Sequence, residues 1–195
     1  KHQVGRRYGS RIEYIFDLMK AKPNDAEPFF TFHKFNEEFK SRSSVSDDCV
    51  DAVWKEVKDY FLTFDEWYRD RNLYHLIGFL VDCGHSVRAL KEKSQEPGLT
   101  KTGFKAYLKS KISGEVNCQL DELVYGDRAL RRVLLLFNIQ TLLSSKEADV
   151  RFPFDRYKDE EWDIEHIRSQ TNREITGKSR REWATDVLEY FTESR

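Results

Sequence analysis

The stretch Leu-Tyr-His-Leu-Ile-Gly-Phe-Leu at residues 73–80 decides the fold class, because its apolar residues recur with the period of an α-helix. Its leucines and its isoleucine follow the spacing i, i+3, i+4, i+7, which places them on one helix face. Cys83-Gly84 then supplies a C-terminal stop, since glycine readily ends a helix. The stretch therefore predicts an amphipathic helix that buries one face.

The same helical spacing occurs on both sides of this stretch. It predicts a helix over residues 10–21, one after Pro28, one that begins at the N-cap Ser46, and one capped by Thr100 or Thr102. Leu130–Leu143 is apolar nearly all round, so we expect it at the centre of a helical bundle. The positions that carry the pattern are Ile12, Ile15, Phe16, Met19, Phe29, Phe32, Phe35, Phe39, Val50, Val53, Trp54, Val57, Phe61, Phe104, Leu108 and Ile112.

Composition excludes a membrane-spanning or wholly disordered chain. The longest apolar run, Val133–Phe137, is far shorter than the roughly 18 residues that cross a bilayer. Aromatic residues make up 14% of the chain, and disordered chains lack them. A chain of 195 residues has room for one domain and part of a second.

The cysteine spacing and the net charge bear on whether the chain is a disulfide-rich, zinc-binding or nucleic-acid-binding protein. The three cysteines lie more than thirty residues apart and form no CxxC pair, so we expect reduced thiols and neither a disulfide framework nor a zinc ribbon. The net charge is −1, and the basic residues are scattered in pairs. This charge distribution produces no strong positive field of the kind that indicates a nucleic-acid partner. A role in DNA binding therefore needs separate support.

Two features suggest an internal piece of a larger protein. Residues 1–5, Lys-His-Gln-Val-Gly, contain neither an initiator methionine nor a signal sequence. Residues 151–157, Arg-Phe-Pro-Phe-Asp-Arg-Tyr, are too rich in aromatics and too interrupted by proline for another amphipathic helix. We therefore expect a helical body over 1–145, followed by a junction and the start of another domain over 146–195.

The sharpest chemical cluster is Trp162-Asp163-Ile164-Glu165-His166-Ile167, where two carboxylates and an imidazole fall within four residues. The apolar flanks favour a short strand. A neutral imidazole can deprotonate water and carboxylates can hold a divalent cation, so the pattern fits metal-assisted hydrolysis of a phosphodiester. A solvated strand edge gives the same pattern and, taken alone, is the more frequent explanation.

Together with Arg-Phe-Pro-Phe-Asp-Arg-Tyr (151–157) and Ser169-Gln170, this cluster resembles the junction in GmrSD-type modification-dependent restriction endonucleases. The resemblance extends over most of the chain. Its further segments are Arg-Ile-Glu-Tyr-Ile-Phe-Asp-Leu (11–18), Tyr-Phe-Leu-Thr-Phe-Asp-Glu-Trp (60–67), Leu-Tyr-His-Leu-Ile-Gly-Phe (73–79) and Leu-Leu-Leu-Phe-Asn-Ile-Gln-Thr (134–141).

The resemblance implies both a fold and a site. Such proteins combine an N-terminal nucleotide-hydrolysing domain, a helical middle, and a C-terminal His-Me finger nuclease related to the HNH enzymes. We therefore expect a mainly α multi-helix bundle with a short α+β segment, an incomplete His-Me finger, near the C-terminus. By this resemblance His166 matches the general base, Glu165 matches a metal-ligand position with Asp163 as a helper, and the metal is Mg²⁺ or Mn²⁺.

The resemblance also implies partners and a location. The full-length protein would cut foreign or modified DNA as a phage defence in the cytoplasm of a prokaryote, in contact with other domains of its own chain and with no membrane. The nucleotide would bind to the N-terminal domain, whose Asp-Gly-Gln-Gln-Arg motif is absent here. Assembly into an oligomer is compatible with this picture.

Two departures from the family pattern bear on activity. The family usually has proline two or three residues after the histidine, whereas Arg168-Ser169 stands here. The later Gly-Asn-Leu and Asn elements would lie past Arg195. We therefore expect an incomplete site and no turnover by this fragment alone, since a general base without its metal shell loses most of its advantage.

Two other functional classes stay open. One is a non-catalytic helical interaction module in which Asp163–His166 is only a strand edge. The other is a DNA-reading module without cleavage, with Arg69, Arg71 and Arg88 as candidates for phosphate contact and an aromatic cluster as a base-stacking platform. Helical spacing favours packing for that cluster, which consists of Tyr60, Phe61, Phe64, Trp67 and Tyr68.

The remaining motifs favour structural roles. Gly177-Lys178-Ser179 copies the tail of a phosphate-binding loop, but Asn172 replaces the required glycine and no apolar strand precedes it. The histidines at 33, 75 and 85 are solitary, so we expect satisfied core or surface side chains at these positions.

Overall fold

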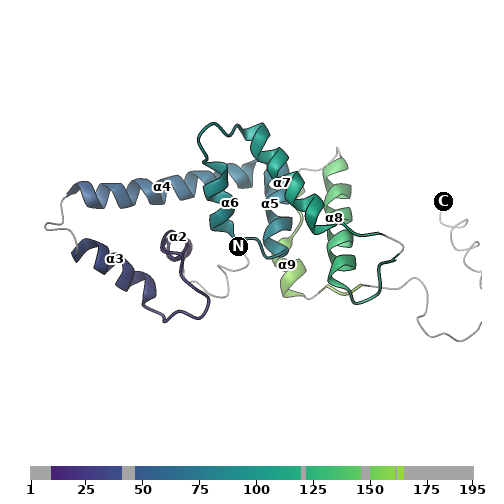
Figure 1. The fold of residues 1–195 in the computed structure, drawn as a ribbon, viewed down its shortest axis with the longest axis horizontal. Helices are drawn as coiled ribbons and strands as arrows, with labels where there is room; N and C mark the ends of the chain where they lie inside the picture. The colour runs from purple at the N-terminus through teal and green to yellow at the C-terminus, as the bar shows by residue number, and fades with distance from the viewer. Residues whose placement is uncertain (1–9, 41–46, 120–121, 146–149, 161, 165–195) are drawn as a thin grey trace, which may run out of the picture. The chain divides into compact units, whose positions relative to one another are not determined.

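The computed structural model describes residues 10–40, 47–119, 122–145, 150–160 and 162–164. These residues form helices and no strand, which confirms the predicted mainly α class. The predicted α+β segment falls on residues of which most lie outside this described part. The helices are α2 (Arg11–Met19), α3 (Phe30–Lys40), α4 (Asp47–Arg69), α5 (Arg71–Asp82), α6 (Val87–Ser94), α7 (Lys101–Glu115), α8 (Arg128–Ser144) and α9 (Phe154–Asp159) (Figure 1).

Helix α5 forms the centre of the larger core and packs against α4, α7 and α8. Its apolar face is buried as the spacing predicts, and its neighbours bury a face of their own against it. A buried core of this kind is the main source of stability in a small helical body. The buried residues of α5 are Leu73, His75, Leu76, Ile77, Phe79 and Leu80.

The prediction that residues 130–143 lie at the centre of the bundle is wrong. Helix α8 buries Leu135 and Ile139 in the core, but Phe137 is 68% exposed. The helix therefore packs through one face, although its sequence is apolar on several. Helix α5 occupies the central position, and α8 packs on it from outside.

A second, smaller core joins α2 to the middle of α4. Ile15 and Met19 of α2 pack with Val57 and Tyr60 of α4, and Phe64 touches both cores. Figure 1 shows α4 as a long helix that runs from α3 at one end to α5 at the other. Helix α4 thus links the two cores.

Side-chain caps begin several helices. Thr100, and not Thr102, caps α7 by accepting a hydrogen bond from the Gly103 amide at 3.1 Å. Asp70 caps α5 by accepting from the amides of Asn72 and Leu73 at 3.0 and 3.1 Å. These bonds satisfy amides that have no partner inside the helix.

Residues up to Trp162 belong to one compact unit, and Asp163 and Ile164 belong to a second. Segment 150–162 therefore packs with the helices, beyond the predicted boundary at 145/146. Among the helices that the structure describes, none combines the length and apolarity that a membrane crossing requires.

Candidate functional site

The predicted catalytic cluster is only partly within the described residues. Asp163 is described and exposed, whereas Glu165 and His166 lie outside. The structure therefore neither brings the three side chains together nor separates them. Within the described ranges, no group of three or more histidine, cysteine or acidic side chains is arranged to hold a metal ion.

The chain that leads into this cluster is docked by aromatic contacts. The ring centroid of Phe152, which is 3% exposed, lies 5.0 Å from Phe154, 5.6 Å from Tyr157 and 5.8 Å from Trp162. Arg131 of α8 donates to the Trp162 carbonyl at 3.0 Å. Edge-to-face ring pairs of this kind add to simple burial. The docking therefore reaches the residue directly before Asp163.

Two arginines reinforce this docking. Arg71 donates through Nε to the Val150 carbonyl at 3.2 Å, and Arg151 donates through Nε to the Tyr68 carbonyl at 3.2 Å. The Arg151 guanidinium also lies 4.8 Å from the centroid of the Tyr68 ring. Residues 150–160 and 162 are thus held by α4, α5 and α8, and we call this stretch the docked segment.

The three arginines that were candidates for phosphate contact already bond within the chain. Arg69 pairs with Asp65 at 2.7 Å and Arg88 pairs with Glu92 at 2.7 Å. Arg71 holds backbone carbonyls of the docked segment and of α8. Each of the three side chains therefore already has a partner within the chain.

The aromatic cluster of α4 divides into a buried and an exposed set. Tyr60 and Trp67 are 4% and 6% exposed, which confirms the packing prediction for them. Phe61 and Tyr68 are 59% and 54% exposed. They line an aromatic groove of about 580 Å³ between α2, α4, α5 and α9. Its other lining residues are Arg11, Tyr14, Ile15, Phe64, Asp65, Trp67, Tyr74, Ile77, Gly78, Val81, Asp82, Val87, Phe154, Asp155 and Lys158.

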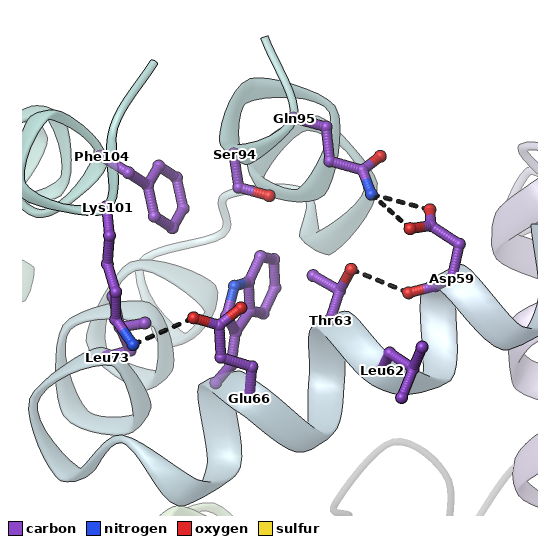
Figure 2. Close-up of a pocket in the computed structure, with 10 residues that line it drawn as sticks. Asp59, Leu62, Thr63, Glu66, Leu73, Ser94, Gln95, Lys101 and Phe104 are labelled. Carbon is purple, nitrogen blue, oxygen red and sulfur yellow. Dashed lines mark hydrogen bonds and ion pairs between the residues drawn. The ribbon is translucent and has the colours of Figure 1, made fainter. Parts of the chain in front are cut away.

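A smaller polar pocket of about 410 Å³ lies between α4, α6 and α7 (Figure 2). The Gln95 amide donates to both oxygens of Asp59, at 2.8 and 2.7 Å. Lys101 pairs with Glu66 at 3.0 Å across the pocket (Figure 2). Lys91, buried beneath, pairs with Asp59 at 2.6 Å. These charged groups are neutralised by one another, so the pocket is best explained as a polar seam between helices.

The histidines and cysteines have environments that favour structural roles. His85 pairs through Nε2 with Glu115 at 3.0 Å, and Glu115 also pairs with Arg132 at 2.7 Å. His33 is exposed on α3, and His75 is fully buried in the core with hydrogen bonds at both ring nitrogens. The three cysteines are half-buried and form no disulfide, and burial raises the pKa of the Cys83 thiol to about 11, which keeps it protonated at neutral pH.

Sequence reasoning missed the docked segment as a structural element and missed the role of His75 in holding it. One signal was present, because a histidine inside an otherwise apolar helix face must find hydrogen-bond partners when it is buried. Comparison of the chain with family models, curated proteins and solved structures finds no match, so the family suggested by resemblance stays a prediction.

Proposed function

We propose that this chain is the helical middle region and the nuclease start of a nucleotide-dependent restriction endonuclease that cuts modified or foreign DNA. The observation that carries the proposal is the order of segments. The docked segment ends at Trp162, and the sequence Asp163-Ile164-Glu165-His166 follows it without a linker. This order, a helical region followed directly in the sequence by two carboxylates and a histidine, is the order that the resemblance implies.

The proposed chemistry uses His166 as the general base that takes a proton from water attacking a phosphodiester. Glu165 and Asp163 supply carboxylate oxygens, the donors that Mg²⁺ and Mn²⁺ prefer. When bound, the cation would stabilise the charge that develops on the phosphate. Since Asp163 is exposed, its carboxylate is accessible to such a cation.

The proposal assigns the remaining partners to the longer protein. Its nucleotide binds to a separate N-terminal domain, its substrate is DNA, and it works in the cytoplasm of a prokaryote. The isolated chain is inactive under this proposal, because no Gly-Asn-Leu element of a His-Me finger follows His166 in it.

The test is plasmid cleavage by the full-length protein with Mg²⁺ or Mn²⁺, on modified and unmodified DNA. His166→Ala is expected to lower the cleavage rate at least about 100-fold, since a general base contributes 10²–10⁴-fold. His33→Ala is the matched control, because His33 is exposed on α3 and is expected to leave cleavage unchanged. Equal cleavage by wild type and His166→Ala would overturn the proposal.

A second candidate function is favoured by the aromatic groove. Exposed Phe61 and Tyr68 form an apolar surface of the kind that marks interaction sites, which suits a non-catalytic helical interaction module. Under this alternative, Phe61→Ser would abolish assembly with a partner while His166→Ala would change nothing. A DNA-reading module without cleavage would instead show DNA binding that weakens steeply with salt.

A further inference from the structure

Two consecutive side chains of α5 hold the docked segment at one residue. The Tyr74 hydroxyl donates to the Phe152 carbonyl at 3.1 Å, and the Phe152 amide donates to Nε2 of His75 at 2.9 Å. Both backbone groups of Phe152 are therefore bonded to side chains. His75 is fully buried, so the bond between its ring and the amide is costly to lose.

The hydrogen-bond pattern defines the tautomer of His75. Nε2 accepts from an amide, so it carries no proton, and the proton resides on Nδ1. Nδ1 donates to the Arg71 carbonyl at 2.6 Å. The docked segment is therefore bonded to the neutral form of the ring.

A second proton on His75 is incompatible with this bond. The imidazolium ion carries an N–H at both ring nitrogens, so Nε2–H would point at the Phe152 N–H. The amide would lose its acceptor, and the buried cation would face a donor. When the segment is released, water solvates the ring, and His75 regains a pKa near its ordinary value of 6.5.

The surroundings of His75 oppose its protonation as well. The guanidinium groups of Arg71 and Arg151 both lower the pKa of the imidazole, because they repel a positive charge on it. Burial raises the pKa of Tyr74 above its ordinary value of 10, so its hydroxyl keeps its proton in mild acid. The titratable and charged groups around the Tyr74–His75 pair are Arg71 of α5, Arg151 and Asp155 of the docked segment, and Tyr68 of α4.

The other contacts of the docked segment depend on the position of Phe152. Its ring, 3% exposed, packs against the rings of Phe154, Tyr157 and Trp162. The Phe154 ring lies so close to Gly78 of α5 that a Cβ added to the glycine would overlap ring atoms. Withdrawal of Phe152 from α5 therefore removes the centre of this ring cluster.

We propose that the docked segment is a proton-released strap, in which a proton on His75 detaches residues 150–160 from α5 while the helices before residue 145 stay folded. Release uncovers the apolar face of α5 and takes away one wall of the aromatic groove, which Phe154, Asp155 and Lys158 line. The strap goes beyond the proposed function and is independent of it, because it involves neither DNA nor a metal.

Proton linkage fixes how the release depends on pH. The released form binds a proton at residue 75 below about pH 6.5, and the docked form resists it. The ratio of released to docked chains should therefore rise about tenfold for each pH unit below that value, until the docked form also binds the proton. Above it the ratio should be constant.

The experiment is amide hydrogen exchange of the whole chain from about pH 7.5 to about pH 5, with rates corrected for the intrinsic pH dependence of exchange. The opening constant of the Phe152 amide is expected to follow the predicted slope. It should also exceed that of the buried Leu108 amide on α7 at every pH, because release leaves α7 folded. Equal opening constants at the two amides would overturn the proposal, since the segment would then open only with the whole body.

Two variants separate the proton from the docking itself. His75→Gln keeps an acceptor and a donor but does not titrate, so the opening constant of Phe152 should no longer depend on pH. Tyr74→Phe removes one hydrogen bond and should raise the constant about 2- to 10-fold at every pH with the slope unchanged. His33→Gln on exposed α3 is the control and should behave like wild type. A wild-type constant that does not change with pH, or a slope that persists in His75→Gln, would overturn the proposal.

Discussion

Burial and hydrogen bonding shift the pKa values of two residues near the start of α5. Burial lowers the pKa of His75 below the ordinary value of 6.5, because the charged imidazolium is poorly solvated there. Burial alone would raise the pKa of Asp70, but hydrogen bonds from Lys105, the Leu73 amide and Lys101 outweigh it and lower the pKa to about 2. His75 is therefore neutral and Asp70 is charged at neutral pH.

These shifts predict two steps of acid destabilisation. Below pH 6.5 the unfolded chain binds a proton at residue 75 more readily than the folded chain does, so the free energy of unfolding falls as pH drops. Between about pH 4 and 2 the Asp70 carboxylate loses its ion pairs, and the free energy falls again. Urea denaturation at a series of pH values should show the first step absent in His75→Gln and the second absent in Asp70→Asn. A first step that persists in His75→Gln would contradict the assignment.

At the scale of elements, α8 shows how a helix that is apolar on several faces uses only one. Leu135 and Ile139 are 2% and 1% exposed, one helical turn apart, and they contact the core around α5. Leu134 and Phe137 point away from it and are exposed. The apolar side chains on the exposed face of α8 thus lie at the surface and take no part in this core.

Substitutions on the two faces of α8 should therefore differ in effect. Leu135→Ala is expected to lower the free energy of unfolding by about 2–5 kcal/mol, because it leaves a cavity in a close-packed core. Phe137→Ser is expected to change it by less than about 0.5 kcal/mol, as is usual for exposed positions. Urea denaturation of both variants measures the contrast, and equal effects would show that α8 is buried on both faces.

At the scale of the whole molecule, the helical body is completed by a segment that lies far from α5 along the chain. The docked segment supplies buried Phe152 to the core, and its backbone and rings bond to α4, α5 and α8. Long-range pairing of this kind joins Tyr74 to a residue 78 positions away. The core between the helices up to residue 145 is therefore incomplete without Phe152, which lies beyond them in the chain.

Truncation should reveal this dependence. A chain that ends at Ser145 is expected to have a free energy of unfolding about 2–5 kcal/mol lower than that of a chain that ends at Trp162, as measured by urea denaturation. The shorter chain exposes apolar surface on α5 and leaves Nε2 of His75 without the Phe152 amide. Phe152→Ala in the longer chain should reproduce most of the loss. Equal stability of the two truncated chains would show that the docked segment adds nothing to the body.

The sequence by itself determined most of the helices and where several of them begin, but it predicted neither α6 (Val87–Ser94) nor the short helix α9 (Phe154–Asp159). Helical spacing predicted the helix at 73–80 and the one over 10–21, and Thr100 was among the predicted caps, because spacing and capping depend on residues a few positions apart. The sequence also suggested the chemistry of Asp163, Glu165 and His166, which remains a prediction. Only the tertiary structure decided that α5 is central, that α8 is not, and that residues 150–162 dock on α5. Those outcomes depend on which surfaces meet across long separations in the chain, and the local period of apolar residues carries no information about that choice.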